Sequence, residues 1–296
     1  MSNYHRSVLL KEVIDLLKVK KGEKIIDATL GGSGHTKAFL EKGAKVLGID
    51  LDEDAIEHTK KSLGENKNLI LVKGNFRDLD KIAHLNNFDK VAGVLFDLGV
   101  SSHQMDTPER GFSFLKGGPL DMRMDKSSGV TAEALVNLLE KGELNDIFNK
   151  FGQERRSRVI SNSIVRARRI RAIKTTGDLA GIIQQAYGVK KEDINEFTKN
   201  LINKRVFQAL RIAVNEEIEN IKEALPKAYG VLGKGGRIAV ISFHSLEDGV
   251  VKNTFKDFEK KNMGKVIIKK PIEVSKRELN ANPRAASAKL RVFEKN

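Results

Sequence analysis

Short apolar runs alternate with amphipathic segments at both ends of this chain. The runs rich in Ile, Val and Leu have the length of buried strands and cover 24–27, 44–49, 69–72, 91–96 and 237–242. Apolar residues recur at helical spacing in 7–17, 36–42, 52–63, 205–225 and 251–261, with Ser7 as the predicted N-cap of the first helix. Strands that alternate with helices indicate βαβ crossovers, so we predict an α/β fold of Rossmann-like type with a mostly parallel sheet.

The alternation stops in the middle of the chain. Residues 99–128 are rich in Gly, Ser, Asp and Met and lack regular periodicity, which is typical of a functional loop or a mobile segment. Residues 131–187 read as helical without clear strands. We therefore predict a core domain of residues 1–105 and 201–296, with a mainly helical domain of residues 106–200 inserted in it. Segments 266–270 and 290–293 are expected to close the sheet as a hairpin-like pair.

The composition narrows the class of protein. With 296 residues, 40% of them hydrophobic, the chain can bury a sizeable core. No apolar run approaches the roughly 20 residues of a membrane span, and the N-terminus lacks the apolar centre of a signal peptide. The absence of cysteine excludes disulfides, a thiolate nucleophile and cysteine-ligated zinc. We expect a soluble cytoplasmic protein.

A glycine-rich turn follows the first predicted strand and points to a nucleoside cofactor. Gly31, Gly32 and Gly34 lie just before a helix whose first N–H groups face the turn. Asp50 ends the second strand about 20 residues further on, the spacing at which a carboxylate receives a ribose. The third glycine of a dinucleotide loop is replaced by Lys37, which favours S-adenosylmethionine over a nicotinamide cofactor. Ordinary tight turns also contain glycines, so the turn alone leaves the function open.

Other candidate residues lie at the same predicted edge of the sheet. Asp97 ends the fourth strand and is a candidate partner of a cofactor or a substrate amine, or else a cap of the next turn. Phe76 follows the third strand and would either stack on an adenine or pack in the core. His244 follows the fifth strand as an acid–base candidate, although isolated histidines are more often structural. His35 and His244 have no further clustered ligands, so we predict no metal site.

A net charge of +14 indicates attraction to polyanions. The charge concentrates between Arg155 and Lys174, where no acidic residue occurs. On a helical projection one face carries Arg155, Arg158, Arg166 and Arg169, and a roughly opposite face carries Ile160, Ile164 and Ala167. Such a face is either simply solvated or meets phosphates, and beside an enzyme-like core we favour contact with nucleic acid.

Three function classes remain compatible with these observations. An S-adenosylmethionine-dependent methyltransferase acting on nucleic acid would account for the glycine turn, the strand-end acids and the charge together. A nicotinamide-dependent oxidoreductase would share the loop and Asp50 but needs the third glycine. A non-catalytic RNA-binding factor would share the charge but would not need strand-end acids.

Several motifs together resemble the RsmH (also called MraW) family over the chain from Tyr4 to its end. They are GGSGH at 31–35, FDLGVSS at 96–102 with Gln104, RGFSF at 110–114, GPLDMRMD at 118–125, FQALRI at 207–212, SFHSLED at 242–248 and NPR at 282–284. The resemblance implies an S-adenosylmethionine-dependent methyltransferase of class I fold that acts on cytosine N4 in 16S rRNA of the bacterial small ribosomal subunit. A homodimer is compatible with the sequence as well.

The resemblance also implies the site residues. Cofactor contacts would fall on Ser33, Gly34, His35, Asp50, Phe76, Asp97 and Gln104. Asp97 is the first candidate for the group that aligns the cytosine amine and His244 is a weaker one, while the proton acceptor stays unassigned. The inserted domain would recognise RNA through its arginine face. The chain departs from the family at Ser33, where glycine is frequent, and at Ala286, where an arginine is common; the first change should be tolerated, and the second alters RNA binding if that arginine touches RNA.

Overall fold

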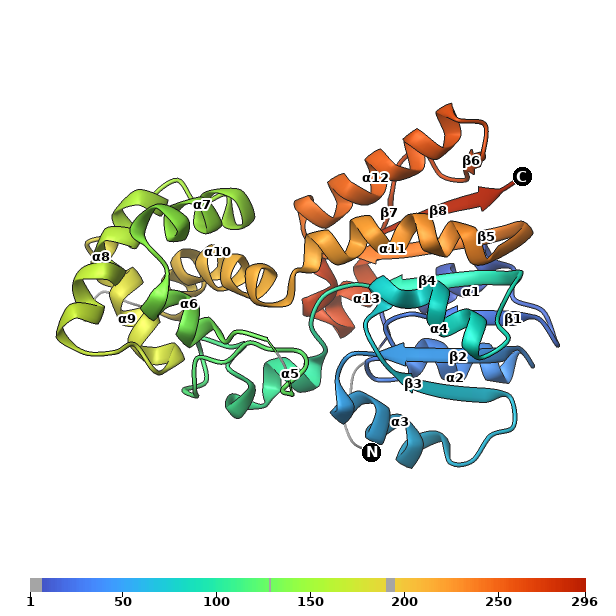
Figure 1. Ribbon diagram of the computed structural model, residues 1–296, viewed down its shortest axis with the longest axis horizontal. Helices are drawn as coiled ribbons and strands as arrows, with labels where there is room; N and C mark the ends of the chain where they lie inside the picture. Colours follow the sequence, from blue (N-terminus) through green and yellow to red (C-terminus); the bar gives the residue numbers. More distant parts are fainter. Residues whose placement is uncertain (1–6, 128, 190–194) are drawn as a thin grey trace. The chain divides into compact units, whose positions relative to one another are not determined.

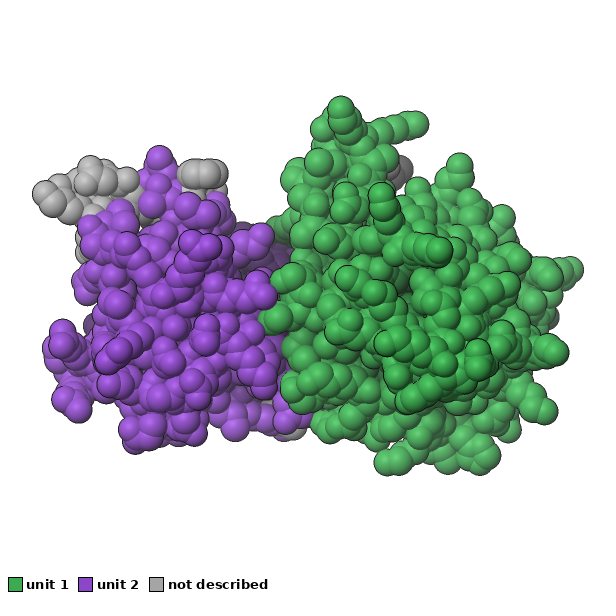
Figure 2. Space-filling view, turned by 90° about the horizontal axis from the view of Figure 1, so that it is seen from above, with its two compact units in different colours: residues 1–101, 218–296 green, residues 102–217 purple. Residues whose placement is uncertain are grey.

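The computed structural model describes residues 7–127, 129–189 and 195–296, and it divides into two compact units (Figure 2). The first, here called the sheet unit, comprises residues 1–101 and 218–296. The second, the helical unit, comprises residues 102–217. The helical unit therefore extends further toward both ends of the chain than the predicted insertion of residues 106–200.

The sheet unit is built on a twisted, mostly parallel sheet (Figure 1). Its parallel strands are β1 (Lys24–Asp27), β2 (Lys45–Asp50), β3 (Leu69–Lys73), β4 (Val91–Asp97) and β5 (Leu232–Ser242), in the order β3-β2-β1-β4-β5. Strand β8 (Lys289–Lys295) pairs antiparallel with β5, and β6 (Gly264–Val266) and β7 (Ile272–Glu273) pair antiparallel with β8. This confirms the predicted α/β Rossmann-like class, and the strand order reverses between β1 and β4, the usual position of a ligand crevice.

Alternate side chains of each strand enter two separate cores, as strands covered on both faces require. Ile26, Val94 and Val240 lie in the core covered by α4 (Leu79–Leu85), α11 (Glu217–Val231) and α12 (Ser245–Lys260). Their neighbours Ile25 and Leu95 lie in the opposite core, which α1 (Leu10–Leu17) and α2 (Gly34–Glu41) cover. Helix α3 (Glu53–Leu63) contacts β2 and β3. The continuous apolar runs of the sequence thus reflect burial on both faces.

Three predicted elements differ from the structure. Helix α1 begins at Leu10 after a left-handed Leu9, so Ser7 is not its N-cap. The helix predicted over residues 205–225 is two helices, α10 (Glu196–Asn215) and α11, because Glu216 adopts a left-handed conformation with φ of 50°. The strand predicted over 266–270 is β6, which ends at Val266 but pairs with β8 as expected.

The helical unit packs around α10. The other α-helices among its described residues are α5 (Ser102–Asp106), α6 (Ala132–Leu138), α7 (Lys141–Gly152), α8 (Ser157–Ile170) and α9 (Thr176–Ala186), and α10 contacts α6, α7 and α9. Buried apolar side chains from the longer helices form its core, among them Phe148, Ile160, Ile183 and Val206. None of the helices in the described part of the chain combines the length and the apolar content needed to cross a lipid bilayer.

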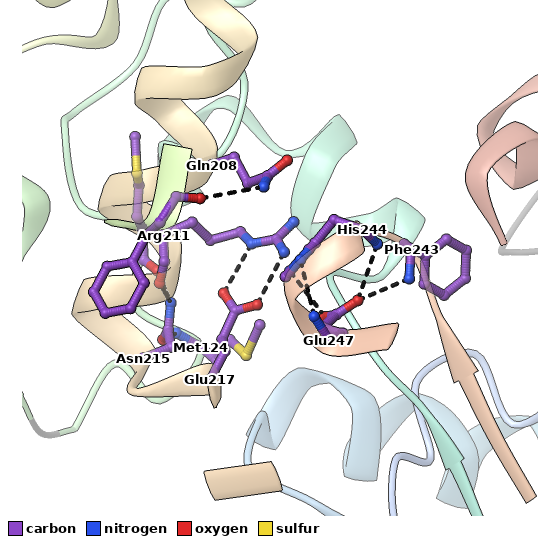
Figure 3. Close-up of polar contacts among 10 residues, drawn as sticks. Met124, Gln208, Arg211, Asn215, Glu217, Phe243, His244 and Glu247 are labelled. Atoms are coloured by element: carbon purple, nitrogen blue, oxygen red, sulfur yellow. Dashed lines mark hydrogen bonds and ion pairs between the residues drawn. The ribbon is translucent and has the colours of Figure 1, made fainter. Parts of the chain in front are cut away.

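The irregular segment before α6 is tied down by polar contacts. The guanidinium of Arg110, only 1% exposed, donates hydrogen bonds to the carbonyl oxygens of Arg123 (3.1 Å) and Met124 (2.9 Å). Asn215 at the end of α10 donates to the Met122 carbonyl (2.8 Å) and accepts from the Met124 N–H (2.8 Å; Figure 3). A buried arginine and an amide thus replace the regular hydrogen bonds that this segment lacks.

Candidate active site

The turn between β1 and α2 lies at the point where the strand order reverses. Gly31 adopts a left-handed conformation with φ of 48°, which glycine reaches at little cost. At Gly34, the first residue of α2, a Cβ would overlap the Ser7 hydroxyl. Gly31 therefore permits the sharp turn, and Gly34 permits the close approach of the segment at Ser7. Gly34 also leaves the first residue of α2 without a side chain.

Asp50 at the end of β2 organises this turn. Its two carboxylate oxygens accept hydrogen bonds from the N–H of Gly31 (2.8 Å) and of Asp52 (2.8 Å). Burial raises the pKa of Asp50 to about 6, against these two hydrogen bonds, which lower it. Each oxygen keeps a second lone pair, so the carboxylate can also accept from the hydroxyls of a ribose.

Asp97 at the end of β4 is held in place through its backbone and one side-chain oxygen. Its N–H donates to the Thr29 hydroxyl (2.6 Å), and its Oδ2 lies 3.6 Å from Nδ1 of His35. The other ring nitrogen of His35, Nε2, lies 3.1 Å from the Val8 carbonyl, to which it donates because a carbonyl can only accept. Asp97 Oδ1 is buried, and no donor among the described residues reaches it.

Asp27 is a site residue that the sequence reasoning missed. It ends β1 between Asp50 and Asp97, is 1% exposed, and accepts hydrogen bonds from the Thr36 hydroxyl (2.7 Å) and the Thr29 N–H (3.4 Å). Burial, the largest cause, raises its pKa to about 7. The signal was present, because Asp27 follows an apolar run in the same way as Asp50 and Asp97 do.

The carboxyl groups at these strand ends repel one another. The pKa of Asp97 is raised well above its usual value, first by burial and then by the charges of Asp27 and Glu247. A buried cluster of acids with one unsatisfied carboxylate oxygen is stabilised by a cation. The positively charged sulfonium and ammonium groups of S-adenosylmethionine meet this requirement, so the residues present fit that cofactor.

Phe76 packs partly in the core of the sheet unit. It begins the short 3-10 helix η1 (Phe76–Asp78) after β3, and its ring packs edge-on against Phe96 with centroids 5.6 Å apart. The ring is nevertheless only partly buried. One edge therefore belongs to the core while the rest can contact a flat ring.

His244 has a structural task in this fold. It is the N-cap of α12, where its Nδ1 accepts from the Glu247 N–H (3.3 Å) while Glu247 accepts from the N–H groups of His244 (3.2 Å) and Phe243 (2.7 Å; Figure 3). A ring nitrogen that accepts a backbone hydrogen bond is not available as a base. The geometry favours Asp97 over His244 as the group that meets a substrate amine.

The remaining predicted residues lie in the helical unit. Gln104 is buried on α5. Arg158, Arg166 and Arg169 are exposed on α8, opposite the buried Ile160 and Ile164, as predicted. Arg155 is also exposed, but α8 begins at Ser157, so Arg155 lies in the preceding turn and the predicted helical face was wrong in including it.

Ser33, the N-cap of α2, has φ of 60° and is the point where this chain departs from the usual glycine loop. A left-handed conformation costs a non-glycine residue about 1–2 kcal/mol, whereas glycine loses about 0.5–1 kcal/mol more chain entropy on folding. The Ser33 hydroxyl lies 3.5 Å from that of Ser62, too far for a strong hydrogen bond. We therefore expect Ser33→Gly to raise the free energy of unfolding in urea by up to about 1 kcal/mol; a decrease of that size would contradict this account.

Comparison with known proteins agrees with this arrangement. The family model described as the MraW methylase family matches residues 2–296. The chain is 41% identical to "Ribosomal RNA small subunit methyltransferase H" of Coprothermobacter proteolyticus, over 100% of this chain and 98% of that protein. It is 44% identical to the protein of the same name from Halothermothrix orenii, over 98% of each.

Proposed function

The chain belongs to the MraW methylase family, and from that premise we propose that it transfers a methyl group from S-adenosylmethionine to the exocyclic N4 amine of a cytosine in 16S ribosomal RNA. The observation that carries the assignment of roles is the unsatisfied, buried Oδ1 of Asp97 at the strand-order reversal. Family membership sets aside the nicotinamide-dependent oxidoreductase and the non-catalytic RNA-binding factor.

In this proposal the sheet unit binds the cofactor. Asp50 receives the ribose, Phe76 contacts the adenine, and Asp97 lies at the methionine end, with Asp27 adding negative charge behind it. The start of α2, with Ser33, Gly34 and His35, approaches the cofactor through its backbone. Gln104 on α5 is a further proposed cofactor contact.

The reaction requires the amine of the base to be aligned with the methyl group, because its lone pair is delocalised into the ring. S-adenosylmethionine supplies the methyl group on a positively charged sulfur. Asp97 accepts a hydrogen bond from the amine N–H, which aligns the nitrogen and disperses the positive charge that develops on it. The target cytosine has to be unstacked or single-stranded to reach this position.

The helical unit recognises the RNA in this proposal. Arg155, Arg158, Arg166 and Arg169 are exposed and would hold the phosphates that flank the target. We further propose that the substrate is the small ribosomal subunit, which places the enzyme in the cytoplasm.

The experiment that tests the function is the transfer of labelled methyl groups to small ribosomal subunits and to free 16S rRNA, followed by mapping of the modified nucleotide. Label on a cytosine N4 supports the proposal, and label elsewhere or none contradicts it. Sedimentation of the same samples distinguishes a monomer from a homodimer.

We expect the affinity for S-adenosylmethionine to increase as the pH rises from about 5.5 to about 7.5. Asp27, with a pKa of about 7, is largely neutral at the lower pH and attracts a cation less, and the raised pKa of Asp97 acts in the same direction. Below about pH 7.5 the amino group of the cofactor stays largely charged, so the change comes from the protein. Calorimetry should show about a three- to tenfold gain per pH unit and release of protons on binding.

The matched variant for this prediction is Asp27→Asn, which removes one titrating group while keeping the shape of the side chain. Its affinity should vary less with pH than that of the unchanged protein. Without cofactor, the raised pKa of Asp27 also predicts that stability falls as the pH rises from about 4 to about 7, because the folded state holds a proton that the unfolded state has lost. An affinity that is constant with pH, or that decreases, would refute the role of the acid cluster.

A further inference from the structure

We propose that a groove between α8 and α9 of the helical unit binds one unpaired nucleotide of the RNA substrate, at a position other than the target cytosine. This inference rests on the proposed function, because it takes the substrate to be RNA. The groove has a volume of about 560 Å³, within the range of sites for small ligands, and residues of the helical unit alone line it.

The floor of the groove is open backbone of α9. Gly177 and Gly181 lie one helical turn apart on that helix and both line the groove. A Cβ at Gly181 would meet no atom within 4 Å, so the space above this glycine is empty. Glycine inside a helix costs stability, and at Gly181 it leaves the backbone of α9 uncovered, so that a planar base can lie against it.

The walls of the groove carry apolar side chains that are only partly buried or fully exposed. Ile170, the last residue of α8, is 90% exposed, and Ile182 and Phe114 line the groove while only partly buried. Phe114 is supported from behind by Phe207, with ring centroids 5.1 Å apart. Exposed aliphatic and aromatic walls suit the face of an unstacked base, and the amides of Gln184 and Gln185 at the same groove can pair with its edge.

The arginines around the groove give it a positive charge, which favours a polyanionic ligand. Arg166 and Arg169 are exposed on the part of α8 that leads into the wall, and Arg171 lines the groove. Arg171 donates to Asp178 (2.7 Å), yet 79% of its side chain stays exposed, so its guanidinium is held at the rim and still accessible. A planar floor, apolar walls, amides and cations together match a nucleotide with its phosphate better than an acidic peptide.

The test fills the groove without disturbing the helix. Gly181→Leu places a side chain in the empty space and replaces a poor helix former by a good one. The matched control is Gly142→Leu on α7, an exposed helical glycine that also has no atom within 4 Å of a Cβ and does not line the groove. The probe is a single-stranded RNA of about 12 nucleotides that carries 4-thiouridine, used for affinity by fluorescence anisotropy and for photo-crosslinking.

We expect Gly181→Leu to weaken RNA binding about tenfold and Gly142→Leu to change it less than about twofold. Both variants should melt no lower than the unchanged protein and keep its cofactor affinity, and crosslinks should fall on Phe114 or within residues 167–185. Three results would overturn the proposal. They are equal affinities of the two variants, crosslinks outside the groove, and displacement of the RNA by polyglutamate but not by unlabelled RNA. If small ribosomal subunits are not methylated, the proposed function fails, whereas a difference between the two variants would still support the groove.

Discussion

Asp97→Ala is expected to lower methyl transfer to small ribosomal subunits by about a thousandfold, within the range that a positioned acid–base group contributes. The variant removes the strand-end carboxylate whose Oδ1 is buried without a donor from the described residues. Under the proposed roles of Asp97, the variant lacks the acceptor for the amine of the base and for the methionine end of the cofactor. Single-turnover methyl transfer with saturating cofactor is the measurement.

The fold should survive this substitution. Asp97 is buried beside Asp27 and Glu247, whose charges raise its pKa, so removing its carboxyl group relieves repulsion instead of breaking a favourable pair with them. The substitution also removes the contact between Asp97 Oδ2 and His35 Nδ1, which lie 3.6 Å apart. We expect the melting temperature and the RNA affinity to stay close to those of the unchanged protein. Asp15→Ala, an exposed acid on α1, is the control and should leave transfer unaltered.

Asp97→Asn separates the two parts of this role. The amide keeps a carbonyl that can accept a hydrogen bond but carries no charge. If charge matters most, Asn should be nearly as inactive as Ala; if alignment matters most, it should recover part of the rate. Full transfer by Asp97→Ala with unchanged cofactor affinity would exclude Asp97 from the reaction.

The second large effect concerns the exposed arginines of the helical unit. Replacement of Arg155, Arg158, Arg166 and Arg169 by glutamine should weaken binding of 16S rRNA about a hundredfold at low salt. If each arginine contacts one phosphate, the slope of log affinity against log salt concentration should become shallower by about 0.7 for each, or about 3 in total. Binding titrations at several salt concentrations measure both quantities.

Neighbouring arginines are left out of this variant because they support the fold. Arg168 donates to the carbonyl oxygens of Val136 (2.9 Å) and Leu139 (2.6 Å), and Arg156 lies over the ring of Tyr187. A control with the same loss of charge replaces the exposed Lys61, Lys67, Lys252 and Lys256 of the sheet unit by glutamine. An unchanged salt slope in the arginine variant, or equal slopes in the two variants, would show that this surface does not bind phosphates.

The structure places the exposed Ala286 in the short 3-10 helix η4 (Pro283–Ser287), so the departure of this chain from the family at that position removes one surface charge and alters no packing. The departure at Ser33 is different in kind, since it changes the backbone preference of the loop itself. Neither departure alters a carboxyl group of the site.

The sequence by itself determined the parts of this protein that depend on local pattern. Runs of β-branched residues predicted the five parallel strands, because strands covered on both faces must be apolar throughout. Asp50 and Asp97 followed, since the residue after such a strand lies at the carboxyl edge of the sheet. The opposition of arginines to Ile160 and Ile164 on α8 was equally visible, because helical spacing alone separates its two faces.

Only the tertiary structure decided the features that depend on which groups meet. The pKa of Asp27 rises because packing removes water from it, and strand pairing places its charge beside Asp97; neither event is encoded within its own segment. His244 is the N-cap of α12 because β5 ends two residues before it and the helix begins directly after it. The left-handed Glu216 divides a continuous helical pattern into two helices, and the groove beside α9 exists because no side chain fills the space above Gly181. The periodicity of apolar residues predicts which residues are buried. The protonation of the site, its backbone strain and its cavities depend on contacts between segments that are distant in the sequence.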